Sequence, residues 1–150
     1  MVRAAGILMP ITSLPSPYGI GTLGQTARDF IQFLEKSGQT YWQILPICPT
    51  GYGDSPYQSS STFAGNPYMI DLDDLVSEGL LLCSDYEDLF WGDEPTKINY
   101  KLLYEQRFVV LKKSVGNVST NMADSLNAFL QTESYWLDDY ALYMAVKNHF

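Results

Sequence analysis

The first part of the chain has the pattern of a strand, a helix and a second strand. Residues 4–11 (AAGILMPI) and 40–45 (TYWQIL) are short and nearly uncharged, which is typical of strands buried on both faces of a parallel sheet. Between them, the spacing of apolar residues predicts a helix over 22–37. Its apolar side comprises Leu23, Ala27, Phe30, Ile31 and Leu34. The short connections favour a βαβ unit with parallel strands.

Local signals mark the ends of this helix. Thr22 and Gln25 have the spacing of a capping box, in which each side chain satisfies an amide of the first turn. Lys36 falls in the last turn, and Gly38 follows where a left-handed residue commonly closes a helix.

The rest of the chain is predicted to be helical. Asp71 suits the cap of a short helix at 72–78, and an acidic, irregular stretch follows at 84–97. Three longer helices are expected at 100–114, 124–131 and 136–149. Asn99 can cap the first of them, whose predicted apolar side comprises Tyr100, Tyr104, Phe108, Leu111 and Val115. The last is apolar nearly all round and therefore needs packing partners on several sides.

The change in character at residue 84 predicts two parts within an α/β fold. Residues 1–83 would carry the two strands and their loops, and residues 84–150 an incomplete helical subdomain. Two parallel strands cannot form a buried sheet alone. We therefore expect the chain to be the front part of a larger protein.

Charge and composition narrow the classes of partner. The 150 residues carry a net charge of −8, with no basic cluster beyond Lys112 and Lys113, which disfavours nucleic acid and anionic membranes. No stretch approaches the length of an apolar membrane span. Cys48 and Cys83 fit no zinc spacing and are interpreted as reduced thiols of a cytoplasmic protein, although spacing does not decide whether they form a disulfide.

A long loop at 46–67 is the strongest candidate for a binding site. It combines many turn-forming residues and short polar side chains with three rings, Tyr52, Tyr57 and Phe63. Such a mixture suits a sugar, which has apolar faces and a rim of hydroxyls. The alternative is a surface loop whose polar groups bond its own backbone. The position of the loop after the second strand favours a site, since ligands of parallel sheets bind beyond the carboxyl ends of the strands.

No catalytic set is visible in the sequence. Glycoside chemistry needs two carboxylates across one bond, but Asp71 and Asp74 are explained as helix-start residues, and Asp54 as a turn residue. His149 and Cys48 have no evident catalytic neighbour. No phosphate loop, dinucleotide fingerprint or metal motif is present, so no cofactor is predicted.

The same loop carries a resemblance to a known family. WQILPICPTGYGDSPYQSSSTFAGNPYMIDLDDLVSEGLL resembles the N-terminal part of 4-alpha-glucanotransferases of the amylomaltase (disproportionating enzyme) family, which pair a WQ-LP segment with PTGYGDSPYQS and AGNP segments. GILMPITSLPSPYGIGTLG, INYKLLYEQRF and YWLDDYALYMAVKNHF resemble the same family. This chain departs from it at Cys48, where a glycine is usual, and at Ser60, where an aromatic residue is often found.

The resemblance implies a fold and an activity. The family is built on a (β/α)8 TIM barrel with helical insertions, of which this chain would supply the first two strands and the start of an insertion. It transfers α-1,4-glucan segments between maltooligosaccharides by a retaining double displacement, without a metal or organic cofactor. The expected partners are maltooligosaccharides or other α-1,4-glucans and the rest of the barrel.

The resemblance also implies roles for four residues. Tyr57 resembles the tyrosine that stacks on the donor sugar beside the cleaved bond, Asp54 and Ser55 would shape the same subsite, and Tyr52 resembles a tyrosine of an accessory glucan site. The nucleophilic Asp, the acid/base Glu and a stabilising Asp of the family lie in later segments. This chain alone is therefore expected to be inactive. A second hypothesis is a non-catalytic glucan-binding module that uses Tyr52, Tyr57 and Trp42.

Overall fold

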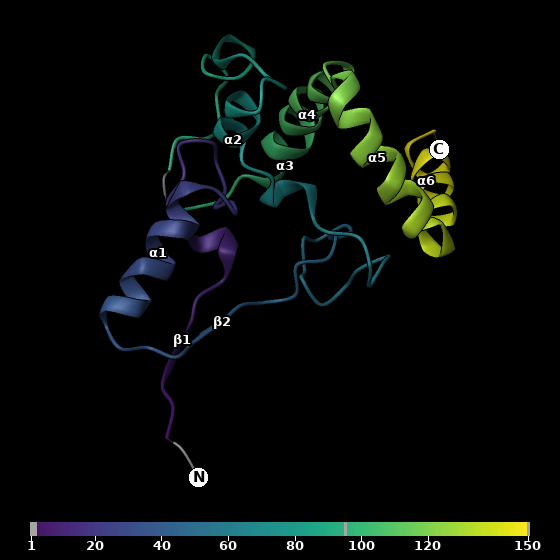
Figure 1. The fold of residues 1–150 in the computed structure, drawn as a ribbon. Helices are drawn as coiled ribbons and strands as arrows, with labels where there is room; N and C mark the ends of the chain where they lie inside the picture. The colour runs from purple at the N-terminus through teal and green to yellow at the C-terminus, as the bar shows by residue number, and fades with distance from the viewer. Residues whose placement is uncertain (1–2, 95, 150) are drawn as a thin grey trace.

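The computed structural model describes residues 3–94 and 96–149 (Figure 1). The strands are β1 (Gly6–Leu8) and β2 (Tyr41–Gln43). The α-helices are α1 (Gln25–Lys36), α2 (Leu72–Ser77), α3 (Tyr100–Leu102), α4 (Phe108–Gly116), α5 (Thr120–Thr132) and α6 (Ser134–His149). Between them lie three short 3-10 turns, η1 (Ile11–Ser13), η2 (Pro67–Met69) and η3 (Cys83–Asp85), and a π-helical turn, η4 (Leu103–Arg107).

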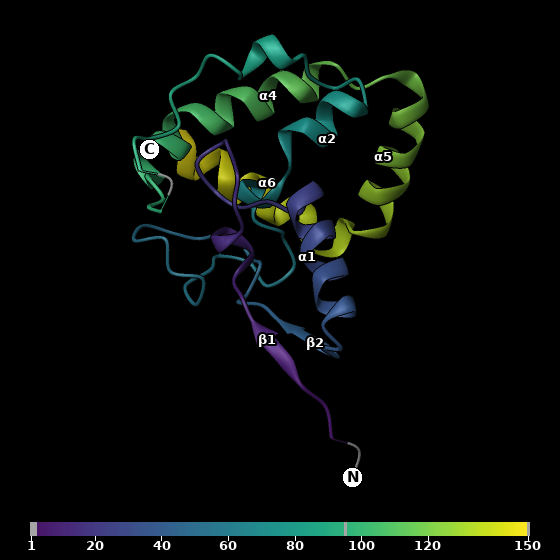
Figure 2. The same ribbon diagram turned by 90° about the vertical axis from the view of Figure 1, so that its left-hand side faces the viewer.

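The two strands pair in parallel, which confirms the predicted βαβ unit. Ile7 lies opposite Trp42 in the register. Each strand has three residues, fewer than predicted, because the chain turns into η1 at Ile11. Burial on both faces is wrong for the chain as described: Leu8 is 56% exposed and Tyr41 63%. The described residues form one strand pair, and Figures 1 and 2 show it beside α1 at the end of the molecule away from α4.

Helix α1 packs through part of its predicted apolar side. Ala27 and Leu34 are buried, and Phe30 packs edge-on against Trp42 with ring centroids 5.0 Å apart. Leu23 and Ile31 are about half exposed, at 49% and 53%. The helix therefore covers the strand pair with a narrower stripe than the sequence indicates.

The start of α1 differs from the prediction, whereas its end agrees with it. The capping box is wrong: the helix begins after Gly24, and the Thr22 hydroxyl donates to Asp71 instead. Gly38 has φ +69°, so the predicted left-handed residue after the helix is confirmed. Gln25 lies in the first turn and donates to Asp29 at 2.7 Å.

The main core joins segments from both sides of residue 84. It contains Ile20, Tyr68, Leu72, Leu81, Tyr86, Trp91, Leu103, Val110 and Leu111. Tyr86 and Trp91 come from residues 84–97, which were predicted to be irregular, and their rings pack against Tyr18. A domain boundary at residue 84 stays a prediction, while the packing across it is continuous.

The elements α3, η4 and α4 follow one another without a break and bury an unexpected face. Asn99 accepts a hydrogen bond from the Leu102 amide at 3.2 Å, which confirms the predicted cap. The buried residues of this segment are Leu103, Arg107, Val110, Leu111 and Ser114. The predicted apolar side is wrong at Tyr104 and Val115, which are 65% and 71% exposed. The predicted apolar side did not include Arg107, whereas in the structure Arg107 faces the core.

Helices α5 and α6 form a hairpin on the side of the molecule away from α1 (Figure 1). None of the described residues of α6 is buried, and Leu142 is 65% exposed. Asp138 and Asp139 lie beyond its first turn, because the helix begins at Ser134. Phe63 of the long loop stacks on Trp136 with centroids 5.7 Å apart. Within the described chain, no helix combines the length and apolar character needed to cross a membrane.

Alkaline pH should destabilise the fold through two tyrosines that share a carboxylate, the half-buried Tyr18 and the buried Tyr86. The Tyr18 and Tyr86 hydroxyls donate to the same oxygen of Asp73, at 2.9 and 2.6 Å. Burial and this hydrogen bond raise the pKa of Tyr18 to about 12 and also raise that of Tyr86. Because the folded-state pKa exceeds the unfolded value of about 10, this stabilisation is complete below about pH 10 and is lost as the pH rises through 12.

Thermal unfolding midpoints measured from about pH 8 to 11.5 test this prediction. The midpoint should fall above about pH 10, and Tyr18→Phe should reduce the slope. Tyr52→Phe, at a fully exposed ring, is the control and should keep the slope of the unmodified protein. The same slope in Tyr18→Phe would contradict the assignment.

Candidate functional site

The loops that follow β1 and β2 meet at the carboxyl ends of the strands. The second of them is ordered by its own backbone: Thr50 and Ser59 form an antiparallel bridge, and the Gly51 amide donates to Gln58 at 3.3 Å. At its base, the Asn66 amide donates to the Ile47 carbonyl at 2.7 Å. The predicted long loop is therefore a closed, hydrogen-bonded structure.

A pocket of about 150 Å³ lies between the two loops. Ile11 and Thr12 of the first loop face Asp54 of the second, with Tyr68 and Tyr100 contributing rings to the wall. Burial raises the pKa of both tyrosines, that of Tyr68 to about 12, and the negative charge of Asp54 adds to the rise. The lining is mostly apolar, and its polar residues include Asp54, Asn66 and two threonines, Thr12 and Thr50.

Asp54 occupies a strained turn at the rim of this pocket. Its φ is +53°, the one positive value among the non-glycine residues described, and its amide donates to Gly51 at 3.1 Å. Burial raises the pKa of its carboxyl, and a hydrogen bond with Thr50 counteracts part of that rise. These contacts agree with the turn role predicted for Asp54.

The other predicted binding residues lie in the same turn. Ser55 is half-buried, and its hydroxyl accepts from the Tyr57 amide at 3.4 Å. The Tyr57 side chain is 73% exposed and follows Pro56, which lines the pocket. Tyr52 is fully exposed. The structure thus brings Asp54, Ser55 and Tyr57 together, and their contact with a sugar stays a prediction.

Trp42 has a structural role that the binding-module hypothesis did not include. Its ring packs against Phe30, and its indole nitrogen donates to the Met9 carbonyl at 2.8 Å. The side chain is half-buried between α1 and the strand pair. A ring engaged in this packing is poorly placed to serve as a sugar platform.

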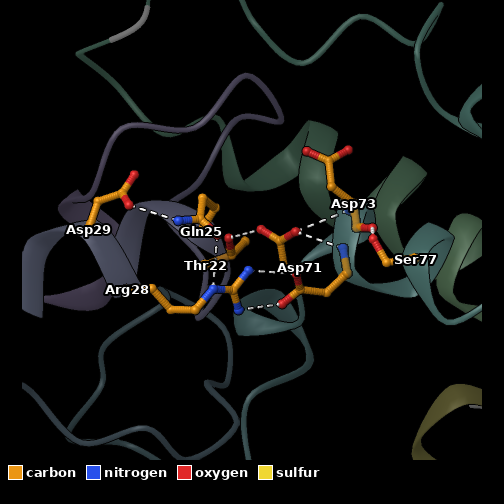
Figure 3. Close-up of polar contacts among 8 residues, drawn as sticks. Thr22, Gln25, Arg28, Asp29, Asp71, Asp73 and Ser77 are labelled. Carbon is orange, nitrogen blue, oxygen red and sulfur yellow. Dashed lines mark hydrogen bonds and ion pairs between the residues drawn. The ribbon is translucent and has the colours of Figure 1, made fainter.

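A polar clamp joins the two loops on the α1 side of the site (Figure 3). One oxygen of Asp71 accepts from the Asp73 and Asp74 amides, both at 3.1 Å, which confirms Asp71 as the cap of α2. Its other oxygen accepts from the Thr22 hydroxyl. Arg28 reaches across from α1 and donates to both oxygens of Asp74, at 2.9 and 2.8 Å. The clamp thereby holds the start of α2 against the loop that precedes α1.

Within residues 3–94 and 96–149, no three His, Cys, Asp or Glu side chains are grouped so that they could hold a metal ion. Cys48 and Cys83 are both free thiols in the described chain, which decides the question left open by their spacing.

The profile of the family described as 4-alpha-glucanotransferase matches residues 9–150. The chain belongs to the 4-alpha-glucanotransferase family. This confirms the resemblance carried by the loop segments.

Relatives extend the match to nearly every residue of the chain. The 4-alpha-glucanotransferase of Clostridium butyricum is 52% identical over 142 residues, covering 95% of this chain and 29% of the relative. That of Thermus thermophilus is 47% identical over 150 residues, covering 97% and 29%. The solved structure of amylomaltase from Streptococcus agalactiae in complex with acarbose has a TM-score of 0.95 at 46% identity, covering 99% of this chain and 30% of that one. The chain therefore spans about 30% of the length of these family members.

Proposed function

We propose that this chain is the amino-terminal part of a 4-alpha-glucanotransferase that transfers α-1,4-glucan segments between maltooligosaccharides. The observation that carries the proposal is the family match over residues 9–150, together with the TM-score of 0.95 to an amylomaltase bound to acarbose. In this proposal, β1 and β2 are the first two strands of a (β/α)8 barrel, and the residues after 84 begin a helical insertion. Two free thiols support a reducing, cytoplasmic location.

The proposed role of the long loop is to hold the donor glucan. Tyr57 would stack on the apolar face of the donor sugar, with Asp54 and Ser55 shaping the subsite and Tyr52 serving an accessory glucan site. The exposed Tyr57 ring beside the pocket supports this assignment. The bridge between Thr50 and Ser59 holds the turn in place before substrate arrives, which lowers the entropy lost on binding.

The proposed chemistry is a retaining double displacement. A carboxylate attacks the anomeric carbon while a second carboxyl group protonates the departing sugar, and a hydroxyl of the acceptor glucan then releases the glycosyl intermediate. We place these groups outside this chain, because Asp54 is engaged by its own turn and by Thr50. The loop contributes by positioning the donor and by excluding water, which would otherwise compete with the acceptor.

Product analysis with maltotriose tests the proposal. The full-length enzyme should yield glucose and a ladder of longer maltooligosaccharides, whereas residues 1–150 alone should yield neither. Glucose and maltose without longer products would indicate a hydrolase and contradict transfer. Binding of maltooligosaccharides without turnover by the full-length protein would favour the glucan-binding module.

A further inference from the structure

Arg107 lies in the interior of the molecule at the end of the π-helical turn η4. Its exposed fraction is 0%, and among the described residues it is the largest side chain that is fully buried. It is also the one buried residue of the described chain that carries a formal charge. Leu103 and Val110 flank it on the same face of the helix and are buried in the core cluster.

The guanidinium group joins the two loops of the candidate site. One terminal nitrogen donates to the Tyr18 carbonyl at 3.4 Å, and the other donates to the Ile70 carbonyl. Tyr18 belongs to the loop after β1, and Ile70 follows the long loop after β2. Arg107 lies 89 residues after Tyr18 and 37 residues after Ile70 in the sequence. Its guanidinium group therefore connects the loop after β1 to the segment that ends the long loop.

These contacts end close to the pocket wall. Ile20, two residues after Tyr18, lines the pocket, and so does Tyr68, two residues before Ile70. A displacement of either carbonyl would therefore be transmitted to the wall through a short, hydrogen-bonded segment. The Met69 carbonyl, next to Ile70, accepts a hydrogen bond from the Leu23 amide at 2.9 Å and links the same two segments directly.

Stability alone does not account for a charge in this position. Burial of a charged side chain is costly, and apolar residues of similar volume often serve a core as well or better. Among the described residues Arg107 forms no salt bridge, so the negative charge of Asp71 offsets only part of the cost, and the Nε atom has no hydrogen-bond partner there. The arginine differs from an apolar residue in its two diverging donors, which fix two carbonyls relative to each other. π-Helical turns, such as the one that carries it, frequently occur at functional sites.

We propose that Arg107 is a positioning residue of the glucan site, which holds the loops after β1 and β2 at the separation that donor binding requires. This inference rests on the proposed glucanotransferase function, because it assigns the pocket between the loops to the donor. Arg107 itself contacts backbone carbonyls and acts on the substrate only through the loops.

Substitutions in the full-length enzyme test the role through substrate binding. Arg107→Met keeps the length and the apolar stem but removes both donors, and it should raise KM for maltotriose by about tenfold while kcat changes by less than about threefold. Arg107→Lys retains one donor at a time and should give an intermediate KM. Arg3→Met is the control: it removes an exposed arginine that precedes β1 and lies outside the clamp and both loops, and it should change KM by less than about twofold.

Hydrogen exchange provides a readout that does not depend on activity. Amides of residues 16–21 and 67–71 should exchange faster in Arg107→Met than in Arg3→Met. A lower kcat with unchanged KM and unchanged exchange rates would show that Arg107 does not position the loops, and it would overturn the inference. If Arg107→Met fails to fold, Arg107→Lys tests the inference in its place. A wild-type KM and wild-type exchange rates in Arg107→Lys would overturn the inference. If the unmodified enzyme makes no oligosaccharides longer than maltotriose, the proposed function fails. The hydrogen-exchange rates still show whether Arg107 holds the two loops in place.

Discussion

Replacing Gly21 with alanine should lower the free energy of unfolding by about 3 kcal/mol or more. A Cβ atom at this position would overlap the Ile11 carbonyl oxygen and would lie 2.7 and 2.8 Å from the carbonyl oxygen and amide nitrogen of Leu14. All three are backbone atoms of the turn around η1, so no flexible side chain can move aside. The loop after β1 must therefore shift, and Ile11 and Thr12 would shift with the pocket wall that they form.

Thermal unfolding of the full-length enzyme measures the effect, and the midpoint should fall by about 3 °C or more. Gly116→Ala is the matched control, because its added Cβ would have no described atom within 4 Å other than those of its chain neighbours and its own helix backbone, and the residue ends α4. Alanine favours the helix there and should be neutral or stabilising by up to about 1 kcal/mol. Equal midpoints for the two variants would show that the approach of Gly21 to η1 is not as close as described.

Tyr57→Ala should lower kcat/KM for maltotriose by about 10- to 100-fold in the full-length enzyme, which corresponds to a loss of about 1.4 to 2.7 kcal/mol of transition-state stabilisation. The expected reason is the loss of the flat ring on which the donor sugar would stack. Because the Tyr57 side chain is 73% exposed and outside both hydrophobic clusters, its removal should leave the fold intact. Reduced transfer at an unchanged unfolding midpoint is therefore the result that we expect.

Two further variants distinguish the ring from its hydroxyl and from general surface effects. Tyr57→Phe keeps the ring and should retain activity within about threefold if stacking dominates. Tyr104→Ala removes another exposed tyrosine, one that packs against Phe108, and should leave kcat/KM near the wild-type value. Wild-type transfer in Tyr57→Ala would remove Tyr57 from the donor site. If Tyr57→Phe were as impaired as Tyr57→Ala, the hydroxyl would carry the interaction.

Features that depend on a few neighbouring residues were predictable from the sequence. Asp71 and Asn99 cap their helices because each side chain reaches amides two or three positions ahead. Gly38 adopts a positive φ because a residue without a Cβ does so at little cost. The parallel pairing of β1 and β2 also follows from local pattern, since a helix of this length between two strands allows few other connections.

The candidate site was predictable in place but not in detail. The position of the long loop after β2 pointed to the end of the strands where the pocket lies, and its turn residues indicated an ordered loop. The walls supplied by Tyr68 and Tyr100 and the link from Thr22 to Asp71 had no local signal. Thr22 has the spacing of a capping residue, yet its hydroxyl bonds a carboxylate 49 positions away. A pattern that describes neighbours along the chain contains no information about such a partner.

Arg107 shows the same division most clearly. The apolar side predicted for its helix contains Tyr104 and Val115 and does not include Arg107. In the structure, two backbone carbonyls from distant loops accept its hydrogen bonds, and the helix turns its charged residue inward. By itself, the sequence determined the helices, most of their ends, the parallel strand pair and the loop that faces the site. Only the tertiary structure decided which helix faces are buried and which side chains join the loops, because those choices depend on free energies of contact between segments far apart in the chain.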